Sequence, residues 1–192
     1  MENLKQELLS RLNGAKKIVF MGIGEEKLTD DGVGPYIISE LLNNSNDRIL
    51  FVNAKIDPMS RIDQIMEYNP SHLIIIDTCT LSEPPGTVSV LERKSFCNIV
   101  PISTHTIPIH IVIDLLVEKL PNLNVFMIGI VPESLEGFSN LILYKEKEFS
   151  LEDKNRNIDL PFFEFQLTKT IKKVADNIIK IIVNVIDELK DF

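Results

Sequence analysis

Short apolar runs alternate with amphipathic segments along most of the chain after residue 16. The runs of strand length are 17–23, 49–54, 73–77 and 124–131. The segments with apolar residues at helical spacing are 31–42, 61–68 and 109–120. Continuous apolar runs are typical of strands buried on both faces, and their alternation with helices is typical of βα units. The pattern therefore predicts an α/β fold around a largely parallel sheet.

Four further segments lie outside this alternation. Residues 87–91 follow a Pro-Pro-Gly turn and alternate between apolar and polar side chains, which predicts a half-buried edge strand. Leucines at helical spacing predict an N-terminal helix over 1–14 that packs on the domain, and 167–189 is expected to form a long amphipathic terminal helix. Residues 136–164 fit neither period, so we interpret them as an insertion, either a passive surface loop or a lid.

Composition narrows the class of protein. The 192 residues are 44% hydrophobic and 25% charged, which predicts one globular domain over 1–192 with a substantial core. A formal net charge of −8 and the lack of a basic stripe argue against nucleic acid as a partner. No apolar run reaches the length of a membrane span and the N-terminus lacks the apolar region of a signal peptide, so we expect a soluble protein without membrane insertion. Cys79 and Cys97 do not form a CxxC motif, which favours a reduced, cytoplasmic setting.

Glycines and acids are concentrated in one loop, GIGEEKLTDDGVG at 22–34, which holds four of the eight glycines. Its four acids are Glu25, Glu26, Asp30 and Asp31. With a single lysine beside them, such a loop attracts cations. A dinucleotide site is an alternative because GxG follows a strand, but Lys27 stands where the Rossmann fingerprint has its third glycine. Helix capping is another alternative, and it accounts for one acid but not for four.

Two further polar residues stand out because of their positions. Asp77 ends the apolar run LIIID, where a carboxylate is costly unless it is paired, bound to metal or released at the open end of the strand. His105 lies in the polar loop STHTIP, and histidine is a common metal ligand. Each residue alone is compatible with a structural role. Together with Asp31 or Asp30 they form a set of two oxygens and one nitrogen that suits a first-row divalent metal with open positions.

Four blocks of the sequence resemble the hydrogenase maturation endopeptidases, which remove the C-terminal extension from the large subunit of nickel-iron hydrogenases. The blocks are GIGEEKLTDDGVGPYIISEL at 22–41, LIIIDT at 73–78, STHTIPI at 103–109 and IGIVPESLE at 128–136. The resemblance implies a three-layer fold with a twisted, mostly parallel sheet of about five strands between helices. It also implies that Asp31, Asp77 and His105 bind metal, with Asp30 either orienting Asp31 or acting as a general base. Glu25 replaces the asparagine that is usual in the family.

The resemblance implies a cytoplasmic endopeptidase that recognises nickel already inserted in the hydrogenase large-subunit precursor. The precursor would be the partner, and it would supply the nickel that Asp31, Asp77 and His105 complete as ligands. An alternative is a nickel carrier or sensor that uses the same three ligands without hydrolysis. A nucleotide-binding protein is a further alternative. The resemblance does not account for the helix at 1–14 or the insertion at 136–164.

Overall fold

The computed structural model describes residues 2–96, 108–136, 142–143, 163–164 and 166–190. Its strands are β1 (Ile18–Ile23), β2 (Ile49–Lys55), β3 (His72–Thr78), β4 (Val88–Glu92), β5 (Asn124–Ile130), β6 (Ile142–Leu143) and β7 (Phe163–Glu164). Its α-helices are α1 (Glu2–Arg11), α2 (Val33–Leu41), α3 (Ile62–Tyr68), α4 (Arg93–Phe96), α5 (Ile109–Lys119) and α7 (Lys169–Lys190). Short 3-10 helices are η1 (Thr29–Gly32), η2 (Leu42–Asn44) and η3 (Pro58–Arg61). The predicted strands and helices are thus confirmed with small shifts of their ends.

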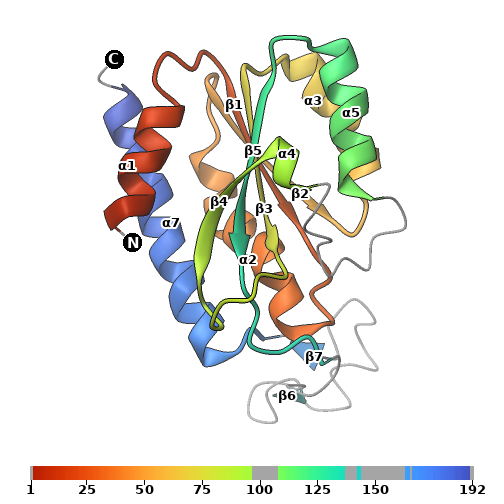
Figure 1. Cartoon of the computed structure of the whole chain (residues 1–192), viewed down its shortest axis with the longest axis vertical. Coiled ribbons are helices and arrows are strands. Elements are labelled where there is room, and N and C mark those ends of the chain that lie inside the picture. Colours follow the sequence, from red (N-terminus) through yellow and green to blue (C-terminus); the bar gives the residue numbers. More distant parts are fainter. Residues whose placement is uncertain (1, 97–107, 137–141, 144–162, 165, 191–192) are drawn as a thin grey trace, which may run out of the picture.

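The main sheet has five strands in the order β2-β1-β3-β5-β4 (Figure 1). Strands β2, β1, β3 and β5 are parallel to one another, whereas β4 pairs antiparallel with β5 at the edge. The predicted α/β fold with a mostly parallel sheet is therefore confirmed. The expected edge strand is confirmed as well, because β4 is only partly buried while β1 and β3 are buried along their full length. Strands β6 and β7 form a separate two-stranded antiparallel sheet within the segment interpreted as an insertion.

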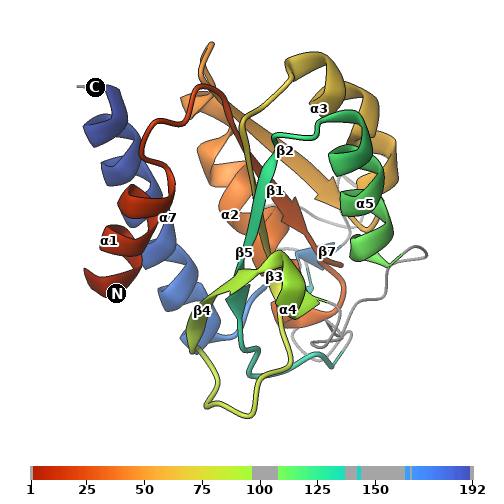
Figure 2. The same ribbon diagram turned by 45° about the horizontal axis from the view of Figure 1, so that its top comes forward.

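Helices cover both faces of the main sheet, which makes three layers (Figures 1 and 2). One face packs on α1, α2 and α7, and the other packs on α3 and α5. Successive strand residues point to opposite faces, so Phe20 and Ile74 contribute to the first core and Met21 and Ile75 to the second. Both sets are buried, which explains why these strands read as continuous apolar runs instead of alternating ones.

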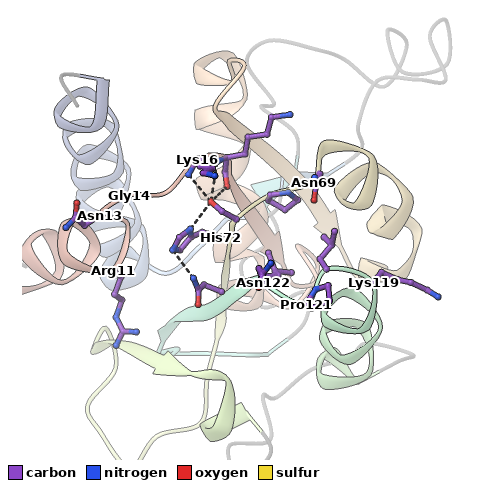
Figure 3. Close-up of a pocket in the computed structure, with 15 residues that line it drawn as sticks. Arg11, Asn13, Gly14, Lys16, Asn69, His72, Lys119, Pro121 and Asn122 are labelled. Atoms are coloured by element: carbon purple, nitrogen blue, oxygen red, sulfur yellow. Dashed lines mark hydrogen bonds between the residues drawn. The ribbon is translucent and has the colours of Figure 1, made fainter.

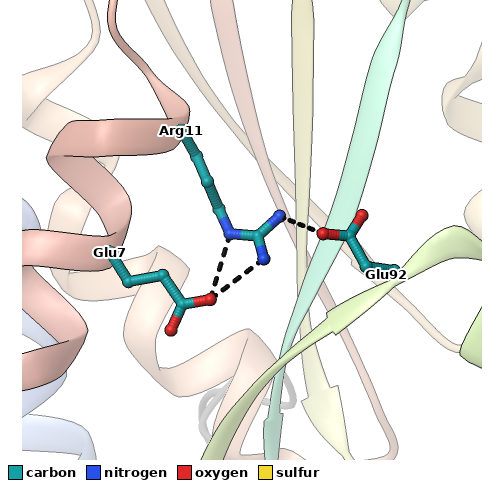
Figure 4. A network of polar contacts seen from close by, with 3 residues as sticks. All are labelled: Glu7, Arg11 and Glu92. Carbon is teal, nitrogen blue, oxygen red and sulfur yellow. Dashed lines mark hydrogen bonds and ion pairs between the residues drawn. The ribbon is translucent and has the colours of Figure 1, made fainter.

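The N-terminal helix packs on the domain as predicted, although it ends at Arg11 and not at residue 14. Leu4, Leu8 and Leu12 are 7%, 0% and 0% exposed in the core shared with α7. Arg11 then links this helix to the edge strand, because its guanidinium donates to Glu7 on α1 and to Glu92 on β4 (Figure 4). Such part-exposed ion pairs contribute little energy, so the leucines are the main attachment of α1.

The helix that follows the loop after β1 begins later than predicted. The predicted helix at 31–42 begins at Val33, and Asp31 lies in η1, one turn of tighter helix. Gly34 in the first turn of α2 lets this helix rest directly on the sheet, since a Cβ there would lie 2.3 Å from the carbonyl oxygen of Ile76. The close contact holds the loop and the start of α2 over the ends of β1 and β3.

Candidate functional site

The strand order changes direction between β1 and β3. The chain leaves β1 to form β2 on one side of it and returns to form β3 on the other side. In open α/β sheets, ligands bind at such a switch point, beyond the carboxyl ends of the strands. The glycine-rich loop at 22–34 follows β1 at this edge, and Asp77 lies at the end of β3. Two of the sequence-predicted site residues, Asp31 and Asp77, therefore come to the same edge of the sheet.

Asp31 is 1% exposed, and both oxygens of its carboxylate accept hydrogen bonds. The backbone N–H of Glu25 donates to Oδ2 at 2.8 Å, and the hydroxyl of Thr78 donates to Oδ1 at 2.8 Å. The first bond folds the loop back on itself, so the carboxylate does not cap α2, whose N-cap residue is Gly32 without a side-chain bond. Capping therefore does not explain Asp31.

Gly24 makes this arrangement of Asp31 possible. Its φ of +138° is one that side-chain-bearing residues rarely adopt, and a Cβ on it would lie 1.8 Å from the carbonyl oxygen of Asp31. The N–H of Gly24 also donates to the carbonyl of Lys55 at 3.0 Å, which joins the loop to the end of β2. Gly24 thus has a packing role at the site formed by the Asp31 and Asp77 carboxylates, which we call the carboxylate site.

Asp77 is 1% exposed and lies beside Thr78 and Cys79. Its Oδ1 accepts from the backbone N–H of Thr78 at 2.7 Å. Burial, together with the nearby Asp77 carboxylate, raises the pKa of the Cys79 thiol to about 11. Cys79 is therefore a neutral thiol near pH 7, which makes it unsuited to act as a thiolate nucleophile.

Asp30 points to a different set of partners from those of Asp31. It is fully buried, and its carboxylate accepts from the N–H groups of Glu133, Ser134 and Thr168 at 3.0, 2.9 and 2.7 Å. The hydroxyl of Thr168 donates to it as well, at 3.1 Å. Thr168 is also the residue that accepts from the N–H of Ile171 at the start of α7. These contacts favour an anchoring role for Asp30, which ties the glycine-rich loop to two distant segments.

The remaining acids of the loop have local partners. Glu26 pairs with Lys55 at 2.8 Å on the surface, and Glu25 accepts from the N–H of Lys27 at 3.1 Å. The composition of the loop predicts a surface that attracts cations. In the structure, the charges of Glu25 and Glu26 are partly met by these local partners. The buried carboxylates of the loop, Asp30 and Asp31, are each directed to defined hydrogen-bond donors.

His105, the predicted nitrogen ligand, lies outside the described residues. Within the described part of the chain, no group of three His, Cys, Asp or Glu side chains is arranged to hold a metal ion. Carboxylate oxygens are hard ligands that would suit a metal ion, and the predicted third ligand, His105, is not among the described residues. The roles of Asp31, Asp77, Asp30 and His105 accordingly stay predictions.

A surface pocket of about 840 Å³ lies at the amino ends of the parallel strands, among the segments that precede β1, β3 and β5 (Figure 3). At its floor, His72 contacts Ser71 through Nδ1 at 3.0 Å and Asn124 through Nε2 at 3.4 Å. Burial lowers the pKa of His72, which keeps the ring neutral near pH 7. In Figure 3 the labelled Arg11, Lys16 and Lys119 point away from one another, so they do not converge on a common ligand.

Sequence reasoning missed two residues that donate hydrogen bonds to Asp31 and Asp30. Thr78 follows Asp77 in the strand, and its only signal is a polar residue at the end of an apolar run. Thr168 stands directly before a long amphipathic helix, which is the usual N-cap signal, but the pattern does not reveal its contact with Asp30. Both contacts join residues far apart in sequence.

Comparison with solved structures defines the structural class of this fold. The fold is similar to that of the nickel-iron hydrogenase maturation protease HycI of Thermococcus kodakarensis, with a TM-score of 0.71, 20% identity, and 94% of this chain and 98% of that chain covered. It is similar as well to the hydrogenase maturating endopeptidase HybD of Escherichia coli, with a TM-score of 0.62, 22% identity, and 90% and 93% covered. At these identities the likeness shows the fold alone.

Sequence comparison then identifies the family. The hydrogenase maturation protease (HycI) family model matches residues 35–148. A Methanocaldococcus jannaschii protein assigned to the hydrogenase maturation proteases is 31% identical over 141 residues, which covers 69% of this chain and 82% of the relative. The hydrogenase 3 maturation protease of Escherichia coli K12 is 24% identical over 115 residues, covering 60% and 72%. The chain belongs to the hydrogenase maturation protease family, as its sequence blocks indicated. No helix in the described part of the chain is long and apolar enough to cross a membrane.

Proposed function

We propose that this protein is an endopeptidase that removes the C-terminal extension of a nickel-iron hydrogenase large-subunit precursor after nickel has been inserted. Membership of the protease family supports the hydrolytic activity in general. The observation that carries the finer proposal is the pair of buried carboxylates, Asp31 and Asp77, which a single residue, Thr78, connects at the switch point of the sheet. Buried carboxylates are costly unless they are hydrogen-bonded, paired or bound to a cation.

The nickel of the precursor is part of the substrate in this proposal. Asp31, Asp77 and His105 would complete its coordination and hold it near the scissile carbonyl. Two carboxylates and one imidazole without a thiolate make a weaker and less selective site than those of self-sufficient metalloenzymes. We therefore expect the purified protein to retain little nickel by itself. A metal held there can polarise the carbonyl or activate a water molecule.

The first experiment compares metal-free with nickel-loaded precursor, using protein that has been treated with chelator and then desalted. Only the nickel-loaded form should lose its C-terminal peptide, which mass spectrometry of the precursor detects. Equal cleavage of both forms would show that the acids act without the substrate's nickel. A nickel carrier or sensor would bind the loaded precursor but leave its mass unchanged, and this outcome would refute the protease proposal in favour of that alternative.

The second experiment replaces ligands one at a time. Asp77→Asn keeps the shape of the side chain and removes its charge, and we expect it to lose processing while remaining folded, as should Asp31→Ala and His105→Ala. Asp63→Asn is a matched control because it makes the same chemical change at an exposed position on α3. Processing by Asp77→Asn at the rate of the control would assign Asp77 a structural role.

A further inference from the structure

Thr78 is fully buried at the end of β3 and donates toward both carboxylates. Its hydroxyl donates to Oδ1 of Asp31 at 2.8 Å, and its backbone N–H donates to Oδ1 of Asp77 at 2.7 Å. We propose that Thr78 is a positioning residue that sets the orientation of Asp31 relative to Asp77. The inference rests on the proposed function, because it assigns Thr78 to the reaction that these two carboxylates serve.

Two hydrogen bonds, one from Glu25 and one from Thr78, fix the orientation of the Asp31 carboxylate. Rotation of a carboxylate about its last side-chain bond is broad when nothing holds the oxygens. Here Glu25 N–H holds Oδ2 and the Thr78 hydroxyl holds Oδ1, so the plane of the carboxylate is defined from both sides. Glu25 belongs to the same loop as Asp31, whereas Thr78 belongs to the strand that carries Asp77. Of these two bonds, the one from Thr78 relates the orientation of the Asp31 carboxylate to the strand that carries Asp77.

The environment makes this bond strong enough to matter. Asp31, Asp77 and Thr78 are at most 1% exposed, so water does not readily replace a lost donor. A hydroxyl that donates to a buried carboxylate is a charge-assisted hydrogen bond and is stronger than a bond between neutral groups. Since Thr78 has no exposed surface, it acts on the precursor only through the carboxylates.

Two substitutions separate the hydroxyl from the rest of the side chain. Thr78→Val keeps the branched shape that suits a strand and removes the donor, whereas Thr78→Ser keeps the donor and removes a methyl group. Thr80→Val is the matched control, because it makes the same chemical change at an exposed position two residues along the chain. For each variant we would measure kcat and KM with nickel-loaded precursor, and the melting temperature.

We expect Thr78→Val to lower kcat by about 10 to 100-fold, as is usual when a partner that orients a ligand is removed. KM should change by less than about three-fold, because Thr78 cannot touch the precursor. Thr78→Ser should restore kcat to within about three-fold of the wild type, and Thr80→Val should match the wild type. Wild-type kcat in Thr78→Val, or a Ser variant as slow as the Val variant, would overturn the proposal.

A double-mutant cycle in melting temperature tests the contact without using activity. If the Thr78 hydroxyl acts on Asp31, Thr78→Val should lower the melting temperature of the wild type but change that of Asp31→Ala much less. Additive shifts would refute the contact. The cycle also distinguishes failure of this proposal from failure of the proposed function. If the shifts are coupled but Asp77→Asn processes normally, the carboxylates have no role in the reaction. If the shifts are additive and Asp77→Asn is inactive, only the role of Thr78 is refuted.

Discussion

Replacement of Gly24 by alanine tests whether the backbone of the loop is built around Asp31. Gly24 has a φ of +138°, and a Cβ added to it would lie 1.8 Å from the carbonyl oxygen and 2.9 Å from the carbonyl carbon of Asp31. Both atoms are backbone atoms, so no side-chain rotation can relieve the overlap. The loop must move, and Asp31 must move with it.

The expected magnitude follows from two contributions. A residue held in such a sparsely populated region of φ costs about 1 to 3 kcal/mol. Displacement of the packed loop adds to this cost, and we expect about 4 kcal/mol in all, at the upper end of single substitutions. For a domain of this size, that corresponds to a fall in melting temperature of roughly 8 to 16 °C.

Gly14→Ala is the matched control for Gly24→Ala. Gly14 also has a positive φ, +74°, but a Cβ there would meet nothing within 4 Å. Only the backbone cost applies, about 1 kcal/mol, and the melting temperature should fall by roughly 2 to 4 °C.

Thermal melting by circular dichroism and processing of nickel-loaded precursor would be measured for both variants, the latter well below the lower melting temperature. Gly24→Ala should melt clearly below Gly14→Ala and process slowly, while Gly14→Ala should process at the wild-type rate. If the two variants melt together and both process normally, the close contact between Gly24 and Asp31 does not exist in solution and our account of the loop is wrong.

Three other predictions follow from the same structure. Because burial lowers the pKa of His72, the unfolded chain takes up a proton first as the pH falls, so wild-type stability should decline below about pH 6.5, and melting curves of His72→Gln should lack this part of the decline. Asp30→Asn removes the charge that accepts four hydrogen bonds, and should lower stability by about 2 to 3 kcal/mol in a denaturant titration; an unchanged midpoint would contradict its anchoring role. Replacing 136–164 by a short Gly/Ser link should lower the melting temperature by less than about 5 °C, and a larger fall would show that 160–165 contributes to the core.

Much of the fold could be predicted from the sequence, because secondary structure leaves a local signal. Strands buried on both faces require continuous apolar runs, and helices that cover a sheet require an apolar stripe. These signals predict the four parallel strands and the long terminal helix. The alternation of apolar and polar residues also predicts the edge position of β4, since a strand with one covered face alternates in sequence. The order of the strands left no such signal, because apolar runs of similar length are interchangeable in pattern.

The candidate site, too, could be predicted from the sequence only in part. The pattern of glycines and acids located the loop, and the end of an apolar run located Asp77. Asp30 and Asp31 are identical neighbours, so the residues alone left open which of them serves the site, and only the resemblance to a family favoured Asp31. Tertiary structure separates them physically: Asp31 meets the hydroxyl of Thr78 from β3, and Asp30 meets Thr168 at the start of α7. Those partners lie 47 and 138 residues away along the chain, and only the packing of α2 and α7 on the sheet brings them into contact.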